Sequence, residues 1–418
     1  MERTTCLVVG GGPAGMVLGL LLARGGVEVT VLEKHADFLR DFRGDTVHAS
    51  TLTLLDELGL GPAFEQVPHQ LVDEVEVLLD GGRKATIADL NRLPGAHRHI
   101  AMVPQWDFLD LLADAGRLEP RFHLRMSTEV TGITRSGGRV TGVTYRDRAG
   151  GHEGEIAADL VVAADGRGSI LRDAVELPVY RFGAPMDVWW FRLPRTEDDP
   201  VRGGAGRFSA GSGMVLIPRG EYFQCAFLIR KGTDEQVRAE GVEKFRDRLV
   251  TLVPWLSDRV GHLTTLDDVK LLDVKLDRLR RWHVDGLLCI GDAAHAMSPV
   301  GGVGINLAVQ DAVAAAALLA KPLRQGGVTG AVLAKVRSRR LFPTVVVQTM
   351  QRAVHRLFLG RKLNSTETVS STGTPFMLRV ARRFPFLQAV PAYLVAIGPR
   401  PEHAPDFARR APQTIVRS

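Results

Sequence analysis

Residues 6–35 read CLVVGGGPAGMVLGLLLARGGVEVTVLEKH, and this stretch decides the fold. The run 6–9 is aliphatic and rich in valine, which is typical of a strand buried in a parallel sheet. Residues 12–24 carry leucine and alanine at the density of a helix, and residues 27–33 alternate as a strand does. The stretch therefore predicts a strand, a tight turn, a helix and a second strand.

The turn contains the pattern G-x-G-x-x-G, formed by Gly10, Gly12 and Gly15. In such a unit the first glycine permits the turn, the second lets a pyrophosphate approach, and the third lets the helix pack on the strand. Free N–H groups at the start of the helix then face the phosphates. Glu33 ends the second strand, where a carboxylate would accept hydrogen bonds from a ribose 2′-hydroxyl. A glycine-rich turn can also bind nothing, but this context favours a dinucleotide.

The composition excludes several classes of protein. A chain of 418 residues is long enough for two closely joined domains. The net charge of +6 is too dispersed to indicate a nucleic-acid partner. Basic residues gather in the last third, which we interpret as a solvated helical surface. Peripheral contact with an anionic membrane or an acidic partner is the lesser alternative.

The cysteines and the apolar runs indicate an intracellular enzyme without a metal. Cys6, Cys225 and Cys289 are far apart and form no C-x-x-C pair, so buried reduced thiols are expected. No signal peptide is apparent at the N-terminus. The longest apolar run, 312–320, is about half of a membrane span. We therefore expect no transmembrane segment and a cytoplasmic location.

Two later stretches repeat the arrangement of an apolar strand followed by an acidic turn. The first strand runs into Asp165-Gly166, and the second, LLCI, runs into Gly291-Asp292. The carboxyl edge of a parallel sheet is where ligands bind, and Asp292 there can hold a ribityl hydroxyl. The glycine-rich loop 299–304 then leads into a helix, whose first amides can face a ring that carries negative charge. Each stretch alone could also be a simple turn.

Together, G-x-G-x-x-G with Glu33, D-G-x-x-S-x-x-R and G-D-A-A-H-x-x-x-P-x-x-G-x-G-x-N resemble the three fingerprints of the group A flavoprotein monooxygenases. These are the relatives of para-hydroxybenzoate hydroxylase and of the aromatic polyketide hydroxylases. The resemblance spans residues 4–320 and implies a non-covalent FAD. Within it, Arg43 matches an arginine near the ribityl–pyrophosphate chain, and Gln105 matches a contact of the phosphates or ribityl. The implied FAD-binding residues are Gly10, Gly12, Pro13, Ala14, Gly15, Glu33, Lys34, Arg43, Gln105, Asp165, Gly166, Gly291, Asp292, Pro299, Gly302, Val303, Gly304, Ile305 and Asn306.

The resemblance also implies a mixed α/β fold with three parts. A Rossmann-like FAD-binding domain would be assembled from residues 1–72, 92–178 and 268–320. An antiparallel sheet that binds the substrate would be inserted as residues 73–91 and 179–267. Strand-like runs and a hairpin that turns at Arg219-Gly220 support this second part. Residues 321–418 would form a helical C-terminal region.

In that family NAD(P)H reduces the FAD, and the reduced flavin forms a C4a-hydroperoxide with molecular oxygen. The hydroperoxide passes one oxygen atom to an electron-rich aromatic or polycyclic small molecule, in secondary metabolism or aromatic catabolism. The nicotinamide cofactor, NADPH or NADH, binds transiently without a nucleotide domain of its own. The protein would be a monomer or a homodimer.

No side chain is assigned as a catalytic acid or base, because the flavin performs the difficult chemistry. His48 and Tyr222 are weak candidates for polarising a phenol, whereas His295 is expected only to shape its loop. Aromatic and apolar residues of the inserted sheet would form the substrate face, with one of two adjacent tryptophans pointing inward. Arg192 and Arg219 are the charged exceptions and could meet a carboxylate or phenolate. The candidate substrate residues are Trp189, Trp190, Arg192, Tyr222 and Pro299.

Three alternatives stay open. Flavin-dependent halogenases share this architecture, but their W-x-W-x-I-P signature is replaced here by WWFRLP, and Lys84 lacks the context of their reactive lysine. The basic and apolar segment 376–390 would suit a quinone hydroxylase at a membrane surface. A non-catalytic flavoprotein is the third alternative. Substrate-stimulated oxidation of NAD(P)H would separate these classes.

Overall fold

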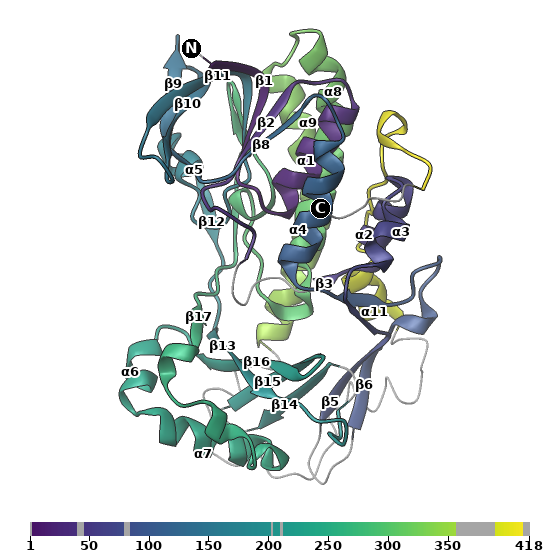
Figure 1. Ribbon diagram of the computed structural model, residues 1–418, viewed down its shortest axis with the longest axis vertical. Helices are drawn as coiled ribbons and strands as arrows, with labels where there is room; N and C mark the ends of the chain where they lie inside the picture. The colour runs from purple at the N-terminus through teal and green to yellow at the C-terminus, as the bar shows by residue number, and fades with distance from the viewer. Residues whose placement is uncertain are drawn as a thin grey trace.

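The computed structural model describes residues 2–39, 46–78, 84–201, 204–209, 212–356 and 389–412. Two sheets form the cores of two bodies that lie one above the other (Figure 1). The upper body holds both long helices, α8 and α9, and the lower body holds the short helices α6 and α7. A mixed α/β architecture is thereby confirmed.

The upper sheet has a parallel centre in the strand order β20-β11-β1-β2-β8. β19 pairs antiparallel with β20, and the β9–β10 hairpin pairs antiparallel with the first half of β11. The strands of this sheet are β1 (Glu2–Val9), β2 (Val29–Leu32), β8 (Phe122–Arg125), β9 (Thr128–Ser136), β10 (Arg139–Asp147), β11 (Glu153–Ala163), β19 (His283–Val284) and β20 (Leu287–Cys289). The apolar runs predicted to be strands thus lie in β1, β2, β11 and β20.

Four helices cover the upper sheet, and their apolar faces complete its core. α1 follows β1 directly and packs on α4 and α8. Short elements connect them: α2 (Ala49–Glu57), α3 (Gly61–Glu65), α5 (Ile170–Ala174) and a three-stranded sheet of β3 (Thr46–Val47), β4 (Gln70–Val72) and β7 (Ile100–Met102). The four covering helices are α1 (Pro13–Arg24), α4 (Gln105–Arg117), α8 (Gly304–Arg324) and α9 (Gly330–Val354).

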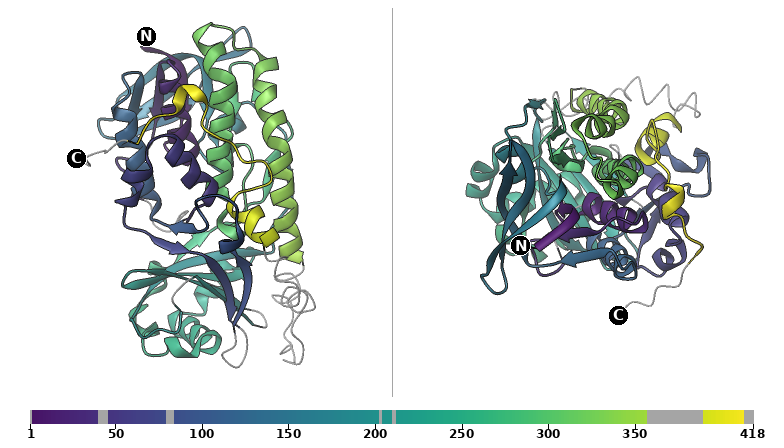
Figure 2. Two further views of the ribbon diagram at one scale, coloured as in Figure 1. Left: turned by 90° about the vertical axis from the view of Figure 1, so that its right-hand side faces the viewer. Right: turned by 90° about the horizontal axis from the view of Figure 1, so that it is seen from above.

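α8 with its preceding turn, residues 300–324, is the one helical stretch in the described residues that is long and apolar enough to cross a membrane. Its most apolar window is 72% buried, and it packs between α1 and α9. The two long helices run side by side (Figure 2). The apolar character of α8 is therefore explained by its place in the core.

The lower sheet has the strand order β17-β13-β16-β15-β14-β5-β6. α6 (Asp234–Ala239) and α7 (Val242–Leu252) lie against one face of it, and the other face is turned toward the upper body. The hairpin between β15 and β16 turns at Gly220–Glu221, because Arg219 pairs with Tyr222. The strands are β5 (Glu74–Leu78), β6 (Lys84–Asp89), β13 (Met186–Pro194), β14 (Ala205–Ser209), β15 (Ser212–Arg219), β16 (Tyr222–Arg230) and β17 (Lys270–Leu272).

Two boundaries differ from the expected division. β17, expected in the upper body, pairs with β13 at the edge of the lower sheet. β12 (Val179–Arg181), expected in the inserted sheet, instead pairs with β18 (Asp277–Leu279) as a separate two-stranded ribbon. This ribbon lies between the two sheets (Figure 1).

The described C-terminal residues are not wholly helical. After α11 (Ala389–Ala396), residues 398–412 run as an extended strap with one short helical turn. Ala404 and Ala408 of the strap pack in the core of the upper body, and the buried Arg24 donates to the carbonyl of Ala408 at 3.0 Å. The strap crosses the helices of the upper body (Figure 2). It is therefore part of that body, rather than a separate region.

Candidate functional site

The three motifs of the sequence meet at the carboxyl ends of β1, β11 and β20. A β-carbon at Gly10 would lie 2.4 Å from the carbonyl oxygen of Ala164, so the first turn touches the chain just before Asp165. A β-carbon at Gly291 would lie 3.2 Å from that of Ala14, at the start of α1. Glycine at these positions lets three segments of backbone converge on one edge.

The glycines of the first turn divide into packed and open positions. Gly10 has φ +107°, and a β-carbon at Gly15 would lie 1.9 Å from the carbonyl oxygen of Gly10. Gly12, which precedes α1, has no atom within 4 Å of the place where its β-carbon would be. Gly10 and Gly15 thus serve chain packing, whereas Gly12 opens space beside the first N–H groups of α1, next to Pro13.

Glu33 holds the first turn in place. Its carboxylate accepts hydrogen bonds from the amides of Gly11 at 2.9 Å and His35 at 3.1 Å, and the residue is 8% exposed. A role toward a ribose stays a proposal, because the described contacts of Glu33 are with its own loops. Lys34 is exposed beside it, and Arg43 lies outside the described residues.

Asp165 is a buried carboxylate just after the end of β11, next to Gly166. Neither of its oxygens forms a well-aligned hydrogen bond with the described residues, although the Ser169 hydroxyl and the amides of Ile170 and Leu171 lie close to it. Burial raises its pKa, although the nearby Ser169 hydroxyl opposes that effect. The neighbouring Gly166 has φ +86° and open space at its β-carbon position. An orphaned acceptor beside an open glycine is the arrangement expected where a ligand supplies the missing donor.

Asp292 is paired with an arginine that the sequence analysis overlooked. Arg167 Nη2 donates to Asp292 Oδ2 at 3.1 Å, and both side chains are partly exposed. Arg167 follows Asp165-Gly166 directly, so this ion pair joins the second motif to the third. The sequence shows Arg167 inside the motif D-G-R-G-S, but its partner Asp292 lies 125 residues further along the chain.

The loop 299–304 is fixed from several sides. Gly301 and Gly302 have φ of +81° and +64°, and the hydroxyl of Thr46 donates to the carbonyl of Gly302 at 3.0 Å. A β-carbon at Gly304 would meet only Met297, at 3.9 Å, so this glycine faces open space. Pro299 and Ile305 are partly exposed, whereas Val303 is buried. The loop therefore presents backbone at the start of α8.

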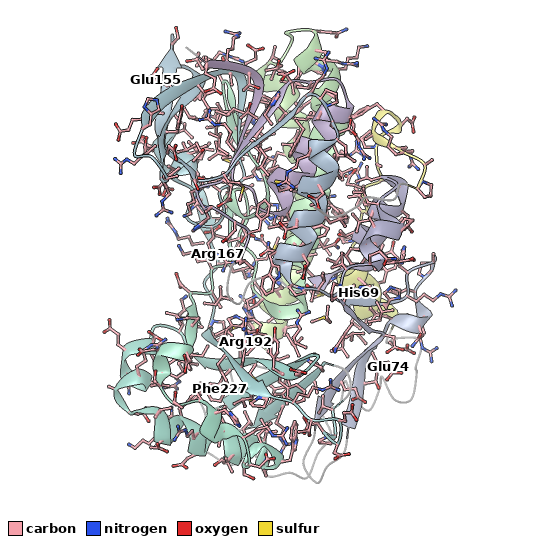
Figure 3. All side chains as sticks on the ribbon, in the orientation of Figure 1. His69, Glu74, Glu155, Arg167, Arg192 and Phe227 are labelled. Atoms are coloured by element: carbon pink, nitrogen blue, oxygen red, sulfur yellow. The ribbon has the colours of Figure 1, made fainter. Side chains whose placement is uncertain are left out.

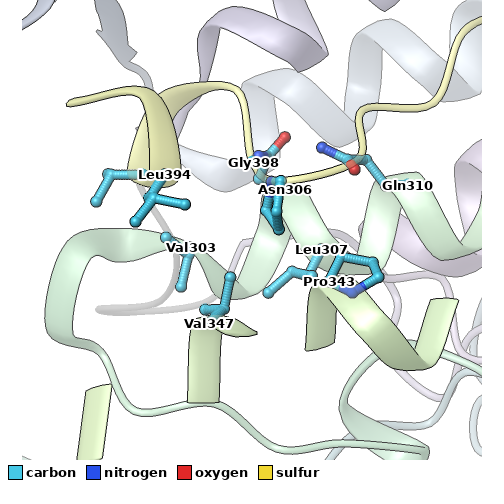
Figure 4. Close-up of a pocket in the computed structure, with 10 residues that line it drawn as sticks. Val303, Asn306, Leu307, Gln310, Pro343, Val347, Leu394 and Gly398 are labelled. Carbon is cyan, nitrogen blue, oxygen red and sulfur yellow. The ribbon is translucent and has the colours of Figure 1, made fainter. Parts of the chain in front are cut away.

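Asn306 uses its side chain inside the protein. Its Oδ1 accepts hydrogen bonds from the hydroxyls of Ser50 at 2.7 Å and Thr51 at 2.9 Å, which ties α8 to α2. Its neighbours Val303, Leu307 and Gln310 line a small cavity with Val347 of α9 and residues near Gly398 (Figure 4). The described contacts thus make Asn306 a brace between helices.

A buried ionic network lies behind Gly291. Asp311 accepts hydrogen bonds from the Gly291 amide at 3.1 Å, His295 Nε2 at 2.5 Å and Arg340 Nε at 3.0 Å. Arg340 also meets Glu402 of the strap at 3.3 Å. Asp311 and Arg340 are fully buried. The network fixes the turn that carries Asp292, and His295 has the contacts of a loop-shaping residue.

α9 holds the same loop through one glutamine. Gln351 accepts from the amide of Ser298 at 3.2 Å and donates to the carbonyls of Ser298 at 2.8 Å and Val300 at 2.9 Å. The Ser298 hydroxyl also lies 2.9 Å from His355 Nε2. The loop 299–304 is thus positioned by a helix that the resemblance left without a role.

His48 caps the start of α2 and is fully buried beside the glycine loop. Its Nδ1 lies 2.7 Å from the carbonyl of Val395, and its Nε2 is 3.5 Å from the β-carbon position of Gly302. Burial lowers the pKa of His48 to about 4. The imidazole is therefore neutral at pH 7, with the proton on Nδ1. Gln105, by contrast, lies at the first turn of α4 and is partly exposed.

The two adjacent tryptophans lie on opposite faces of β13, as strand alternation predicts. Trp189 is fully buried under α7, with its ring 5.0 Å from that of Phe245, and its Nε1 donates to Asp234 at 2.6 Å. Trp190 packs on the opposite face, with Val300 of the loop 299–304 in the same cluster. The inclusion of Trp189 in the substrate face is therefore corrected, since its side chain belongs to the core beneath the sheet.

Trp190 shares its face with two other candidates. Arg192 lies two residues further along β13, and its guanidinium carbon stands 5.0 Å from the ring centre of Tyr222. Arg167 and Arg192 lie on the sides of the two bodies that face each other (Figure 3). The Trp190 Nε1 is buried and has no hydrogen-bond partner among the described residues. This face thus combines apolar surface with a few polar groups.

The residues at the strand ends fit FAD. Gly12 and Gly166 leave room for backbone contact with phosphate, and Asp165 offers an unused carboxylate. Asp292 is partly exposed at the same edge, and Gly304 opens the start of α8. Within the described residues no cluster of histidine, cysteine and carboxylate side chains could hold a metal ion. Cys6, Cys225 and Cys289 are buried free thiols.

We expect Asp292→Ala to weaken FAD binding by about tenfold to a hundredfold, because one charge-assisted hydrogen bond contributes roughly 1.5–3 kcal/mol. Titration of the apoprotein with FAD measures this change. Asp159→Ala is the matched control, because it removes the same charge from a pair with Arg3 at the start of the sheet. An unchanged dissociation constant for Asp292→Ala would remove this residue from the cofactor site.

Known proteins are similar to this chain in sequence and fold. Residues 3–350 match the family described as FAD binding domain. A 6-methylpretetramide 4-monooxygenase from Streptomyces rimosus is 35% identical over 93% of this chain and 91% of its own. Among solved structures, an anhydrotetracycline hydroxylase from Streptomyces rimosus superposes with a TM-score of 0.71 at 20% identity, over 94% of this chain and 76% of its own. A flavin-dependent halogenase superposes with a TM-score of 0.74 at 23% identity, over 97% of this chain and 74% of its own.

The two solved structures establish the fold alone, because their identity to this chain is low. The family match covers most of the chain, and the monooxygenase relative covers nearly all of it. Together with the converging motifs, these matches assign the sequence. The chain belongs to the FAD binding domain family and, within it, to the FAD-dependent aromatic monooxygenases.

Proposed function

We propose that this enzyme uses NAD(P)H and molecular oxygen to hydroxylate a polycyclic aromatic polyketide of the tetracyclic kind. The observation that carries the proposal is the 35% identity, along almost the whole chain, to a 6-methylpretetramide 4-monooxygenase. The largely apolar face that carries Trp190 supports a large, flat substrate. The flavin-dependent halogenase shares the fold, but the more similar relative is a monooxygenase.

FAD, when bound, would accept electrons from NAD(P)H and activate molecular oxygen. Gly12 and the first amides of α1 would hold its pyrophosphate, and Gly10 and Gly15 would let the turn and the helix pack closely enough to place them. Asp165 and Asp292 would hold its ribityl chain and neighbouring groups at the strand ends. The loop 299–304 would place backbone amides, at the start of α8, next to negative charge on the ring.

The lower sheet would close the site from the other side. Trp190 and the apolar residues of its cluster would bury the substrate and exclude water, which limits the wasteful release of hydrogen peroxide. Arg192 and Tyr222 would meet an oxygen-bearing ring edge. His48 is neutral at pH 7 and lies against the glycine loop, so it could act only as a hydrogen-bonding group there.

The proposal is tested with purified, FAD-loaded enzyme and two probes, 6-methylpretetramide and anhydrotetracycline. Consumption of NADPH and NADH is followed with and without each probe, and products are identified by mass spectrometry. We expect at least one probe to stimulate oxidation of the reductant and to gain a hydroxyl group. Oxidation that neither probe stimulates would contradict the substrate class, and chlorination in the presence of chloride would favour the halogenase alternative.

The two tryptophans provide a matched pair of variants. We expect Trp190→Phe to weaken binding of a hydroxylated tetracycle by about twofold to tenfold, because one neutral hydrogen bond contributes roughly 0.5–1.5 kcal/mol. Trp189→Phe removes the same donor on the opposite face, where it bonds to Asp234. That control should lower the stability and leave binding unchanged. Quenching of tryptophan fluorescence measures both affinities, and equal effects of the two variants would contradict the assignment of the faces.

A further inference from the structure

Four arginines gather on the ribbon β12–β18 and the adjoining face of α9. None of them forms an ion pair with a carboxylate in the described part of the chain, where most other arginines do. Two carboxylates in and just after β18 are engaged with other groups, since Asp277 accepts from the Ala296 amide and Asp285 pairs with Arg139. We call this cluster the arginine patch; its members are Arg278, Arg280, Arg337 and Arg352.

The members of the patch crowd one another. Arg278 and Arg352 both stand over the ring of Phe182, at 5.3 Å and 4.9 Å from its centre. Burial, together with the nearby Arg337 and Arg352, lowers the pKa of Arg278. The Nε of Arg337 is buried without a hydrogen-bond partner among the described residues. Like charges held together without carboxylates are unfavourable unless an anion joins them.

Aromatic rings accompany the arginines. Arg280 stands 4.3 Å from the ring centre of Tyr180, and Tyr180 is 43% exposed. Guanidinium groups bind phosphate through paired N–H groups and stack on flat rings, whereas a tyrosine ring can stack on a nucleotide base. The patch therefore offers both of the contacts that an adenine nucleotide needs.

The patch adjoins the proposed flavin site. Phe182 packs in the cluster that contains Met297 and, from the loop 299–304, Val303. β18 pairs with the chain after Asp292, because the amides of Asp277 and Leu279 donate to the carbonyls of Ala296 and Ala294. A dinucleotide that is bound to the patch by one end would thus lie beside the loop 299–304, where the flavin ring would be.

We propose that the arginine patch binds the adenosine 2′-phosphate end of NADPH, so that the enzyme prefers NADPH to NADH. The proposal rests on the proposed function, because it assigns a docking site to the reductant of that reaction. The sequence has no second G-x-G-x-x-G turn that could take this role. A cluster of arginines that has no carboxylate partner in the described part of the chain would distinguish the two reductants, since only NADPH carries the additional phosphate.

The test uses FAD-loaded protein and adenosine 2′,5′-bisphosphate as the probe in isothermal titration calorimetry. We expect the double variant Arg280→Gln/Arg352→Gln to bind the probe at least about tenfold more weakly than the wild type, because the loss of even one charge-assisted hydrogen bond weakens binding by about tenfold. Arg324→Gln is the matched control, an exposed arginine at the far end of α8. Tyr180→Leu should weaken binding of the probe but leave binding of inorganic phosphate unchanged.

Rapid mixing then follows flavin reduction without any aromatic substrate. The wild type should be reduced faster by subsaturating NADPH than by NADH, and the double variant should lose that difference while its FAD content stays normal. Equal binding of the probe by wild type and double variant would overturn the proposal. Binding of anionic phosphatidylglycerol vesicles without binding of the probe would overturn it in favour of a membrane contact. Neither result depends on the tetracyclic probes, so the proposed substrate class is tested separately.

Discussion

Gly12→Val should give a folded protein that has lost its FAD. The backbone of Gly12 is extended, with φ −74° and ψ −179°, and valine adopts this conformation without strain. No atom lies within 4 Å of the new β-carbon, so the apoprotein should keep its stability. The added methyl groups would occupy the space that a pyrophosphate needs. Because two or more charge-assisted hydrogen bonds would be lost, we expect FAD affinity to fall at least about a hundredfold.

Gly15→Ala is the informative comparison three residues later. Its β-carbon would lie 1.9 Å from the carbonyl oxygen of Gly10, so α1 would have to move away from β1. This variant should lower the thermal unfolding temperature of the apoprotein, whereas Gly12→Val should not. Flavin absorbance after gel filtration and thermal unfolding of the apoprotein separate the two effects. Normal FAD content in Gly12→Val would contradict the place given to the phosphates.

Arg340→Leu should be the most destabilising single change in the helices behind the site. Arg340 is fully buried and contacts both Asp311 and Glu402, which would be left as buried carboxylates with fewer partners. Removing one member of a buried ion pair costs about 3–5 kcal/mol. Denaturant unfolding of the FAD-loaded protein measures the loss. Arg339→Leu is the control, because Arg339 contacts the same Glu402 from a partly exposed position and should cost less than about 1 kcal/mol.

The same network predicts a dependence on pH. Burial alone would raise the pKa of Asp311, but His295 and Arg340 outweigh it, and the net pKa is lowered. A carboxyl with a lowered pKa stabilises the fold above its unfolded pKa, and this contribution is lost as the pH falls through the folded value. The wild type should therefore keep this contribution down to about pH 4. In Arg340→Leu the pKa of Asp311 in the folded protein should move back toward its unfolded value, so the free energy of unfolding should fall less steeply below about pH 4 than in the wild type. Equal slopes for the two proteins would contradict the role of Arg340.

The sequence was sufficient for those parts of the fold that local patterns determine. The turn at Gly10, Gly12 and Gly15 and the strands before Asp165 and Asp292 were predicted because glycine spacing and apolar runs act over a few residues. Alternation also predicted that Trp189 and Trp190 point to opposite faces. It could not say which face is turned toward the flavin domain, because the packing of α7 on the sheet decides that.

Contacts between distant residues were not predictable. The pair of Arg167 and Asp292, the network around Arg340 and the arginine patch each join segments that no short pattern relates. The strap 398–412 was expected to be helical, but it is held extended by side chains of the upper body. The cytoplasmic location, the oligomeric state and the roles of individual FAD-binding residues stay predictions.

The most direct test of the account is a labelling experiment with heavy-isotope molecular oxygen. The FAD-loaded enzyme is given NADPH, 6-methylpretetramide and labelled oxygen in ordinary water, and the product is analysed by mass spectrometry. The account predicts a hydroxylated product in which the new oxygen atom carries the label. Product whose new oxygen comes from water, or consumption of NADPH that yields only hydrogen peroxide, would contradict it.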